Sequence, residues 1–212
     1  MKWMVCPVGA IQANCYLLID EASNQSLIID PGGEFEKIET IITKEQLSPL
    51  AILLTHAHFD HIGALDQVRD TWNIPAYLHE SEATWLNDPS KNGSAFFPMI
   101  SPVHARQAEF LISDKDKGHL SIGPFSCEFR HTPGHSPGGV SYYFEKERTL
   151  FCGDTLFQGS IGRTDQYGGD TEQLLMSIDR QVLTLPDETV VCPGHGSVTT
   201  IGKEEGSNPF LI

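Results

Sequence analysis

The sequence has 212 residues, of which 40% are hydrophobic, and a formal net charge of −14 at pH 7. This length suffices for a buried core without disulfides or a structural metal. The acidic charge disfavours binding to a nucleic-acid backbone, which has the same sign. No apolar run approaches the ~18 residues of a membrane span, and the first residues lack a signal-peptide pattern. We therefore expect one cytoplasmic domain over residues 1–212, with neither nucleic acid nor a membrane as partner.

The first third of the chain predicts strands followed by helices. Apolar runs predict strands over 3–8, 15–20 and 26–30, the last two joined as a hairpin by a polar turn. A turn signal at 30–33 precedes apolar residues at helical spacing over 35–42. The short run 51–54 is continuously apolar, which is typical of a buried central strand. Beyond it, one helix face is traced by Ile62, Leu65, Val68 and Trp72.

The remainder of the chain continues in the same style without repeating the sequence. A strand is predicted over 75–78 and a short helix over 80–86, whereas residues 88–107 are rich in Pro, Ser, Gly and Asn and predict an irregular surface excursion. Further strands are predicted near 124–131, 139–145, 149–152 and 189–192, with a helix near 171–184. Strands in both halves with helices between them predict an α/β protein with two sheets covered by outer helices.

The cysteines give no sign of a disulfide framework. Their number is odd, no two are spaced as Cys-x-x-Cys, and most lie in strand-like apolar runs: Cys6, Cys15, Cys127, Cys152 and Cys192. We interpret them as small buried hydrophobic residues in a reducing compartment, rather than as nucleophiles or metal ligands.

The most unusual segment follows the predicted strand 51–54, where the chain reads Thr55-His56-Ala57-His58-Phe59-Asp60-His61. In extended chain, residues two apart point to the same side, so His56 and His58 can bind one ion. Where the chain turns into the helix, Asp60 and His61 are directed to a second point nearby. Imidazole and carboxylate are ligands favoured by Zn²⁺ and compatible with Fe or Mn. The segment therefore predicts a metal site.

Three further motifs also combine a strand end with a Gly-containing turn. They are Thr132-Pro133-Gly134-His135, Cys152-Gly153-Asp154-Thr155 and Cys192-Pro193-Gly194-His195-Gly196. Each motif alone is compatible with a plain turn. In layered α/β folds, however, ligands bind beyond the carboxyl ends of the strands, so we expect all four segments to face one cleft.

In this order, the motifs resemble those of the metallo-β-lactamase superfamily. The stretches 132–138, 153–157 and 160–165, with Asn208-Pro209-Phe210, are most similar to its glyoxalase II (hydroxyacylglutathione hydrolase) branch. The resemblance implies an αβ/βα four-layer sandwich of two mixed sheets between outer helices. It also implies a ligand set: His56, His58 and His135 on a first metal, Asp60, His61 and His195 on a second, and Asp154 bridging the two.

The implied activity is metal-dependent hydrolysis. Two adjacent divalent ions, Zn²⁺ foremost, lower the pKa of a shared water and supply a bridging hydroxide as nucleophile, which Asp60 is placed to orient. One ion also polarises the scissile carbonyl. A thiolate leaves without a strong general acid, so small acyl-thiol esters such as S-lactoylglutathione are the expected substrates.

The chain departs from the longer glyoxalase II enzymes after its last predicted ligand. We expect the additional helical domain of those enzymes, which grips glutathione, to be absent, and Gly-His-Glu-Tyr is replaced by Gly194-His195-Gly196-Ser197. Arg163 is the basic position that remains. Two roles stay open for it: a bidentate grip on a substrate carboxylate, or a salt bridge with Asp165.

Residues outside the motifs have modest expected roles. Asp30 resembles the family's Asp-x-Gly turn, which leaves two interpretations: a hydrogen bond to a ligand histidine from behind, or an ordinary turn aspartate. We interpret His79, His104, His119 and His131 as hydrogen-bonded or solvated side chains. Of these, His131 has the best position for supporting His135.

Alternative functions share the same scaffold. A mononuclear-iron persulfide dioxygenase would use the counterparts of His56, His135 and Asp154, although the Cys that often closes its Thr-Pro-Gly-His motif is Gly139 here. A nuclease is disfavoured by the acidic charge. A non-catalytic metal-binding protein is a last alternative, but all seven predicted ligand positions are filled.

Overall fold

The computed structural model describes residues 1–113 and 117–211. The chain forms two compact units, one of residues 1–113 with 121–125, the other of residues 117–120 with 126–211. Each unit is built around its own six-stranded sheet. No helix in these described ranges is long and apolar enough to cross a membrane. The single-domain organisation expected from the sequence stays a prediction.

The first sheet is mixed, with the strand order β1-β2-β3-β4-β5-β6. Strands β1 to β3 pair antiparallel, and β3 to β6 pair parallel. The predicted hairpin is confirmed as β2 and β3, and the predicted central strand as β4. The bounds are Lys2–Val8 for β1, Ala13–Ile19 for β2, Gln25–Ile29 for β3, Ser48–Leu53 for β4, Ala76–His79 for β5 and Phe110–Ile112 for β6. Strand β6 was not predicted from the sequence.

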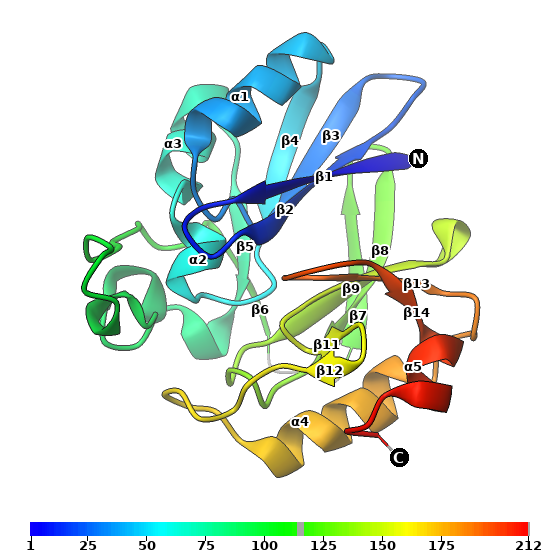
Figure 1. Ribbon diagram of the computed structural model, residues 1–212. Helices are drawn as coiled ribbons and strands as arrows, with labels where there is room; N and C mark the ends of the chain where they lie inside the picture. The colour runs from blue at the N-terminus through cyan, green and yellow to red at the C-terminus, as the bar shows by residue number, and fades with distance from the viewer. Residues whose placement is uncertain (114–116, 212) are drawn as a thin grey trace. The chain divides into compact units, whose positions relative to one another are not determined.

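Helices α1 (Phe35–Lys44) and α3 (Leu65–Trp72) lie side by side in the first unit (Figure 1). Their apolar faces contribute to the core that also contains the sheet residues Leu17, Ile28 and Ile52, together with Ile38, Ile42, Leu65 and Val68 of the helices. These are positions that the helical periodicity of the sequence singles out, and their burial is the main stabilising contribution of the helices.

The predicted helix over 62–72 is interrupted. A four-residue helix α2 (Phe59–Ile62) ends at Gly63, and α3 begins two residues later. The break has a local cause: Ala64 N–H donates to the carbonyl of Pro31 at 2.9 Å, and a Cβ atom at Gly63 would lie 2.4 Å from the carbonyl oxygen of Gly32. The backbone at 63–64 thus packs directly on the turn after β3.

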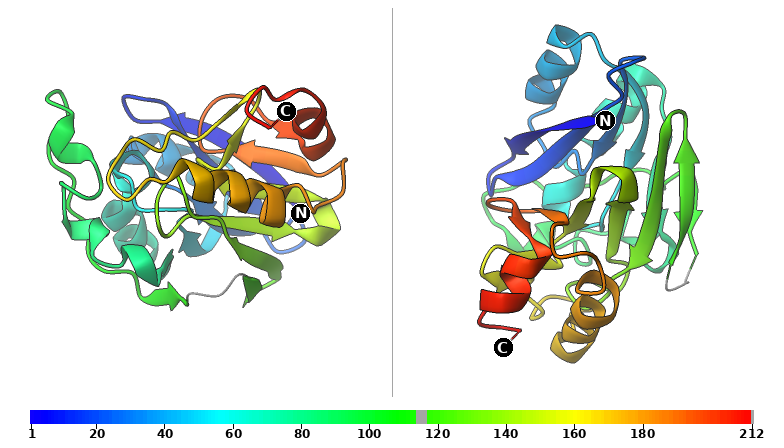
Figure 2. Two further views of the ribbon diagram at one scale, coloured as in Figure 1. Left: turned by 90° about the horizontal axis from the view of Figure 1, so that it is seen from below. Right: turned by 90° about the vertical axis from the view of Figure 1, so that its right-hand side faces the viewer.

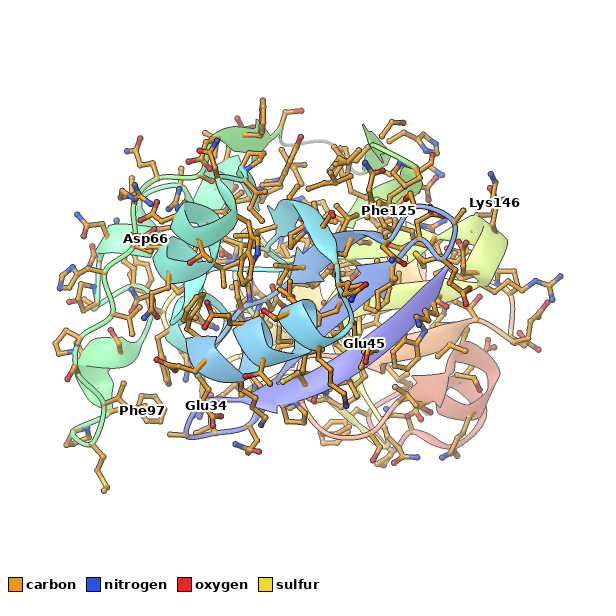
Figure 3. The ribbon with its side chains drawn as sticks, turned by 90° about the horizontal axis from the view of Figure 1, so that it is seen from above. Glu34, Glu45, Asp66, Phe97, Phe125 and Lys146 are labelled. Atoms are coloured by element: carbon orange, nitrogen blue, oxygen red, sulfur yellow. The ribbon has the colours of Figure 1, made fainter. Side chains whose placement is uncertain are left out.

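The excursion predicted over 88–107 has a buried base. Single 3₁₀ turns at Glu80–Glu82 and Trp85–Asn87 precede it, and another lies at Ser94–Phe96. The buried Asn92 side chain donates to the carbonyls of Trp85 (3.2 Å) and Val103 (3.0 Å). The ring of Phe97, labelled in Figure 3, packs against Phe59 with centroids 4.7 Å apart. The surface prediction therefore holds for most of the segment, whereas residues 92–94 and 105 are buried.

The second sheet is also mixed, with the order β14-β13-β10-β9-β8-β7. Strands β10 and β13 run parallel, whereas β9 pairs antiparallel with β8 and β10, and β14 with β13. The bounds are Lys117–Ile122 for β7, Phe125–His131 for β8, Val140–Phe144 for β9, Thr149–Gly153 for β10, Val190–Pro193 for β13 and Thr199–Thr200 for β14. Strands β8, β9, β10 and β13 match predicted strands.

Helix α4 (Thr171–Ser177) packs against this sheet, as Figure 2 shows. The predicted helix over 171–184 is confirmed, although its second part, Ile178–Val182, adopts wider π-helical turns. Asp170 caps the helix by accepting the N–H of Gln173 at 3.0 Å. The sequence did not predict strands β7 and β14, the short hairpin of β11 (Leu156–Phe157) and β12 (Ser160–Ile161), or helix α5 (Ile201–Ser207).

Candidate metal centre

Four predicted ligands gather in the first unit, just beyond the end of β4. All are buried: His56, His58, Asp60 and His61. The ring of His56 lies edge-on to that of His58, with centroids 4.8 Å apart, and 4.1 Å from the ring centroid of His61. His61 Nε2 lies 3.3 Å from Asp60 Oδ2. The structure thus brings these four residues together, as the sequence predicts. We call them the first ligand cluster.

Asp30 supports this cluster from behind. Its Oδ2 lies 2.9 Å from His61 Nδ1 and accepts the hydroxyl of Thr55 at 2.6 Å, while Oδ1 accepts the Thr55 N–H at 2.8 Å. Because an ionised carboxylate only accepts hydrogen bonds, His61 Nδ1 carries the proton and Nε2 keeps its lone pair for an ion. Of the two interpretations of Asp30, the hydrogen bond to a predicted ligand is therefore the one observed.

The turn that contains Asp30 requires glycine next to it. Asp30 itself has a positive φ of 50°, a conformation that aspartate tolerates better than most residues. A Cβ atom at Gly32 would lie 1.6 Å from the carbonyl oxygen of Asp60. Only glycine allows the turn to approach the ligand-bearing helix this closely.

Glu82 is a buried acid that the sequence did not single out. Its Oε2 accepts the N–H of Ala57, the residue between His56 and His58, at 2.5 Å. Trp85, one turn further, lies with its ring centroid 5.8 Å from that of His58. In sequence, Glu82 is one acid in a short polar helix, and only the fold places it beneath the ligand-bearing backbone.

The other three predicted ligands gather in the second unit, and we call them the second ligand cluster. Asp154 follows β10, His135 lies in the loop after β8, and His195 follows β13. Asp154 Oδ2 lies 3.5 Å from His135 Nε2 and 3.7 Å from His195 Nε2. One carboxylate oxygen thus faces two imidazole nitrogens, and the bridging role of Asp154 stays a prediction.

A backbone carbonyl orients His135. Its Nδ1 donates to the carbonyl of Arg163 at 2.7 Å, and its Nε2 lies 3.5 Å from Asp154 Oδ2. Gly162 makes this approach possible, because a Cβ atom there would lie 1.8 Å from the carbonyl oxygen of Asp154. His131 Nε2 lies 2.9 Å from the carbonyl of Pro137 and ties the loop to β8. Its support of His135 stays a prediction.

The side chain of Arg163 is engaged by Asp165. The guanidinium donates from Nε to Oδ1 at 2.7 Å and from Nη2 to Oδ2 at 2.8 Å. These hydrogen bonds raise the pKa of Arg163 and lower the pKa of Asp165 to about 2. Of the two roles left open for Arg163, the salt bridge is present, and its exposed position keeps the pair accessible to solvent.

The cysteines play no part in either cluster. All five are free and buried, as predicted. Burial raises the pKa of Cys127 to about 12 and that of Cys15 well above its ordinary value. These groups are therefore neutral thiols at pH 7, whereas metal ligation requires thiolate.

The chemistry of the donors fits divalent metal ions. Each cluster combines imidazole nitrogens with a carboxylate, the set suited to zinc, iron and manganese. In each, a histidine Nδ1 donates to an oxygen behind it, from Asp30 in the first and Arg163 in the second. Such outer hydrogen bonds fix the ring of a metal-ligating histidine. That the two clusters bind the same ions stays a prediction.

Mixed sheets whose strand ends present imidazole and carboxylate groups define an α/β metal-binding enzyme. The sequence matches the family described as "Metallo-beta-lactamase superfamily" over residues 8–195, and the chain belongs to it. It has the metallo-β-lactamase fold and is a metal-dependent hydrolase of this superfamily.

Two relatives match the chain along its whole length. One is "Probable metallo-hydrolase YqgX" of Bacillus subtilis (strain 168), 55% identical, with 100% of this chain and 98% of that protein covered. The other is "Hydroxyacylglutathione hydrolase GloC" of Haemophilus influenzae, 36% identical, with the same coverage of 100% and 98%.

Two solved structures are closely similar. The crystal structure of the BLEG-1 B3 metallo-beta-lactamase shares 52% identity and a TM-score of 0.94, covering 99% of both chains. TTHA1623, solved in a di-iron-bound form, shares 38% identity and a TM-score of 0.85, covering 98% of this chain and 100% of its own.

Proposed function

We propose that this protein hydrolyses small acyl-thiol esters of the hydroxyacylglutathione type, using two divalent metal ions. The observation that carries the proposal is the end-to-end match to the Haemophilus relative, which is named for that activity and has almost the same length. The sequence resemblance to glyoxalase II points the same way.

In this proposal, the two clusters hold the ions jointly. His56, His58 and His135 would hold the first ion, Asp60, His61 and His195 the second, and Asp154 would contribute to both. Support comes from the orientation of the donors: His61 and His135 both present Nε2 because Nδ1 is engaged, and Asp154 faces two imidazoles. Zinc suits this donor set, and the relative solved with two irons supports iron as the alternative.

Bound divalent ions would supply water ionised near neutral pH and a polarised carbonyl. The chain's own groups perform the remaining tasks. The buried carboxylate of Asp60 accepts a hydrogen bond from the attacking water and so orients it toward the acyl carbon. The thiol carrier departs as a thiolate, so no residue has to donate a proton. Arg163 binds a carboxylate of the substrate when its guanidinium exchanges Asp165 for the ligand.

The test is hydrolysis of S-D-lactoylglutathione by zinc-loaded protein, compared with His58→Ala. The matched control is His104→Ala. His104 is exposed, and its hydrogen bond to Asn87 lies outside both ligand clusters. We expect His58→Ala to lower kcat/KM by at least 100-fold and His104→Ala to leave it unchanged. Equal rates for the wild type and His58→Ala would refute the proposal.

A second candidate is hydrolysis of β-lactams, favoured by the 52% identity to a B3 metallo-β-lactamase. Both thioesters and β-lactams are hydrolysed by attack of hydroxide on a carbonyl carbon. Measuring kcat/KM for the thioester and for a chromogenic cephalosporin with the same protein therefore distinguishes the two candidate functions. We expect the thioester to be the better substrate. Elemental analysis of protein purified without added metal tests the iron dioxygenase alternative, which requires one iron per chain and O₂ uptake.

The proposal includes a cytoplasmic location and a small-molecule partner in place of nucleic acid or a membrane. Five free, buried thiols support a reducing compartment. The formal charge of −14 supports the exclusion of nucleic acid.

A further inference from the structure

Two buried polar side chains near the C-terminal end, Glu204 and Asn208, belong to neither ligand cluster. Glu204 lies on α5, Asn208 directly after it, and both are almost completely shielded from solvent. Removing a carboxylate from water costs several kcal/mol unless hydrogen bonds compensate. A surface helix does not need such a residue for its own stability. The contacts of these side chains therefore indicate what they hold in place.

Most of their contacts lead to one turn, that between β11 and β12. Glu204 Oε2 accepts the N–H of Gly159 at 2.7 Å and the amide of Asn208 at 2.9 Å. The Asn208 amide also donates to the carbonyl of Ser160 at 3.0 Å and lies 3.5 Å from that of Phe157. Both sides of the turn are thus held by α5. We call Glu204 and Asn208 the hairpin clamp.

The clamped hairpin and the two residues that follow it contact every member of the second ligand cluster. At its start, the ring of Phe157 lies edge-on to His195, with centroids 6.3 Å apart. After its end, Gly162 packs against the backbone of Asp154, and the Arg163 carbonyl accepts the Nδ1 proton of His135. A shift of the hairpin would therefore move all three contacts together.

Anchoring of α5 alone does not explain the clamp. The helix is already fixed by Ile201 in the core of the second unit and capped by Thr200, whose hydroxyl accepts the N–H of Lys203. An apolar side chain at position 204 would serve that purpose at lower cost in desolvation. Glu204 also accepts the hydroxyl of Thr199 next to the start of α5, a contact local to the helix. The N–H of Gly159 belongs to the hairpin, so anchoring of α5 does not explain this second contact.

We propose that Glu204 and Asn208 are positioning residues for metal binding: by fixing the β11–β12 hairpin, they set the orientation of His135 and His195 around Asp154. The inference rests on the metal-binding part of the proposed function and is independent of the substrate. Loss of outer support of this kind lowers metal affinity about 10- to 100-fold.

The central experiment compares Glu204→Gln with Glu205→Gln. Residue 205 is exposed on the same helix, so the control makes the same chemical change without touching the hairpin. Zinc affinity is measured by competition with a chromogenic chelator. We expect at least a 10-fold loss of affinity for Glu204→Gln and less than a twofold change for Glu205→Gln. Equal affinities in the two variants would overturn the proposal.

A second readout needs neither metal nor substrate. In the metal-free protein, the hydrogen bond from His135 Nδ1 to the Arg163 carbonyl gives a slowly exchanging imidazole proton in nitrogen-15 NMR spectra. We expect this proton to exchange faster in Glu204→Gln and at the wild-type rate in Glu205→Gln. Unchanged exchange in both variants would show that the clamp does not orient His135.

Asn208→Ala provides the same test if Glu204→Gln does not fold. It removes the donors to the hairpin carbonyls but keeps the acceptor for Gly159, so we expect a smaller, several-fold loss of zinc affinity. Wild-type affinity in folded Asn208→Ala would count against the clamp. A wild type that binds zinc but does not hydrolyse thioesters would refute the proposed substrate and leave this inference standing.

Discussion

Replacing Asp30 by asparagine tests the support of the first ligand cluster most directly. The carboxylate receives three donors: the N–H and hydroxyl of Thr55 and the Nδ1 proton of His61. An asparagine amide has the same shape and also tolerates the positive φ at this position. It has, however, only one acceptor oxygen, and its nitrogen only donates. The variant therefore changes the hydrogen bonds and leaves the backbone alone.

Both orientations of the amide carry a cost. With its nitrogen toward Thr55 N–H, two donors face each other in a buried site, which costs about 1–3 kcal/mol. With its nitrogen toward His61, the ring must take the other tautomer and place its proton on Nε2, the atom needed for an ion. We expect Asp30→Asn to lose about 1–3 kcal/mol in unfolding free energy and about 10- to 100-fold in metal affinity.

Urea unfolding and chelator competition measure these two quantities. Asp20→Asn is the matched control, because Asp20 accepts the N–H and hydroxyl of Ser23 in an exposed turn. We expect it to change stability by less than about 0.5 kcal/mol. If Asp30→Asn matched the wild type in both stability and affinity, the tautomer argument would be wrong.

Three further predictions concern other contacts. Gly162→Ala places a Cβ atom 1.8 Å from the carbonyl oxygen of Asp154, so we expect it to abolish tight zinc binding in chelator competition. Gly206→Ala is the control, because the space around Gly206 is open, and we expect its zinc affinity to be unchanged. Arg69→Met leaves two carboxylates and two carbonyls without their buried guanidinium, and we expect it to lower the free energy of unfolding in urea by about 3 kcal/mol. Asp165→Asn releases Arg163 and lowers KM for a carboxylate-bearing thioester at constant kcat. The depressed pKa of Asp165, about 2, means that its contribution to stability is present above the unfolded value and is lost as pH falls toward 2. The stability of Asp165→Asn should therefore fall less than that of the wild type as the pH is lowered toward 2, as measured by acid unfolding.

Long, fully buried elements were predicted from the sequence because their patterns are strong. The hairpin over 15–30 and the central strand at 51–54 are continuous apolar runs bounded by turn residues, and their burial is nearly complete. By contrast, β6, β11, β12 and β14 have two or three residues each, too few for any periodicity. Their pairing depends on tertiary contacts that no local pattern contains.

The predicted helix over 62–72 shows a different limit. Its apolar spacing is correct, but the break at Gly63 arises from the close approach of the turn at Gly32, thirty-one positions earlier in the chain. Periodicity reports which face of a segment is buried. It does not report a distant backbone pressing against it.

For the site, the sequence predicted the residues that bear the chemistry more completely than those that support them. His56 to His61 form one short motif, and the structure groups them as expected. Glu82 and Glu204 could not be recognised, because an acid in a short helix is ordinarily solvated. Their burial follows from contacts with Ala57 and Gly159, which lie far away in sequence.

The hydrogen bond from His135 to the main chain of Arg163 has an evolutionary consequence. A peptide carbonyl is supplied by any amino acid, so the side chain at position 163 can change while the imidazole keeps its orientation. The adjoining Gly162 has no such freedom, because any side chain there would collide with the backbone. Descendants of this chain can thus vary the side chain at one position while its neighbour is held constant.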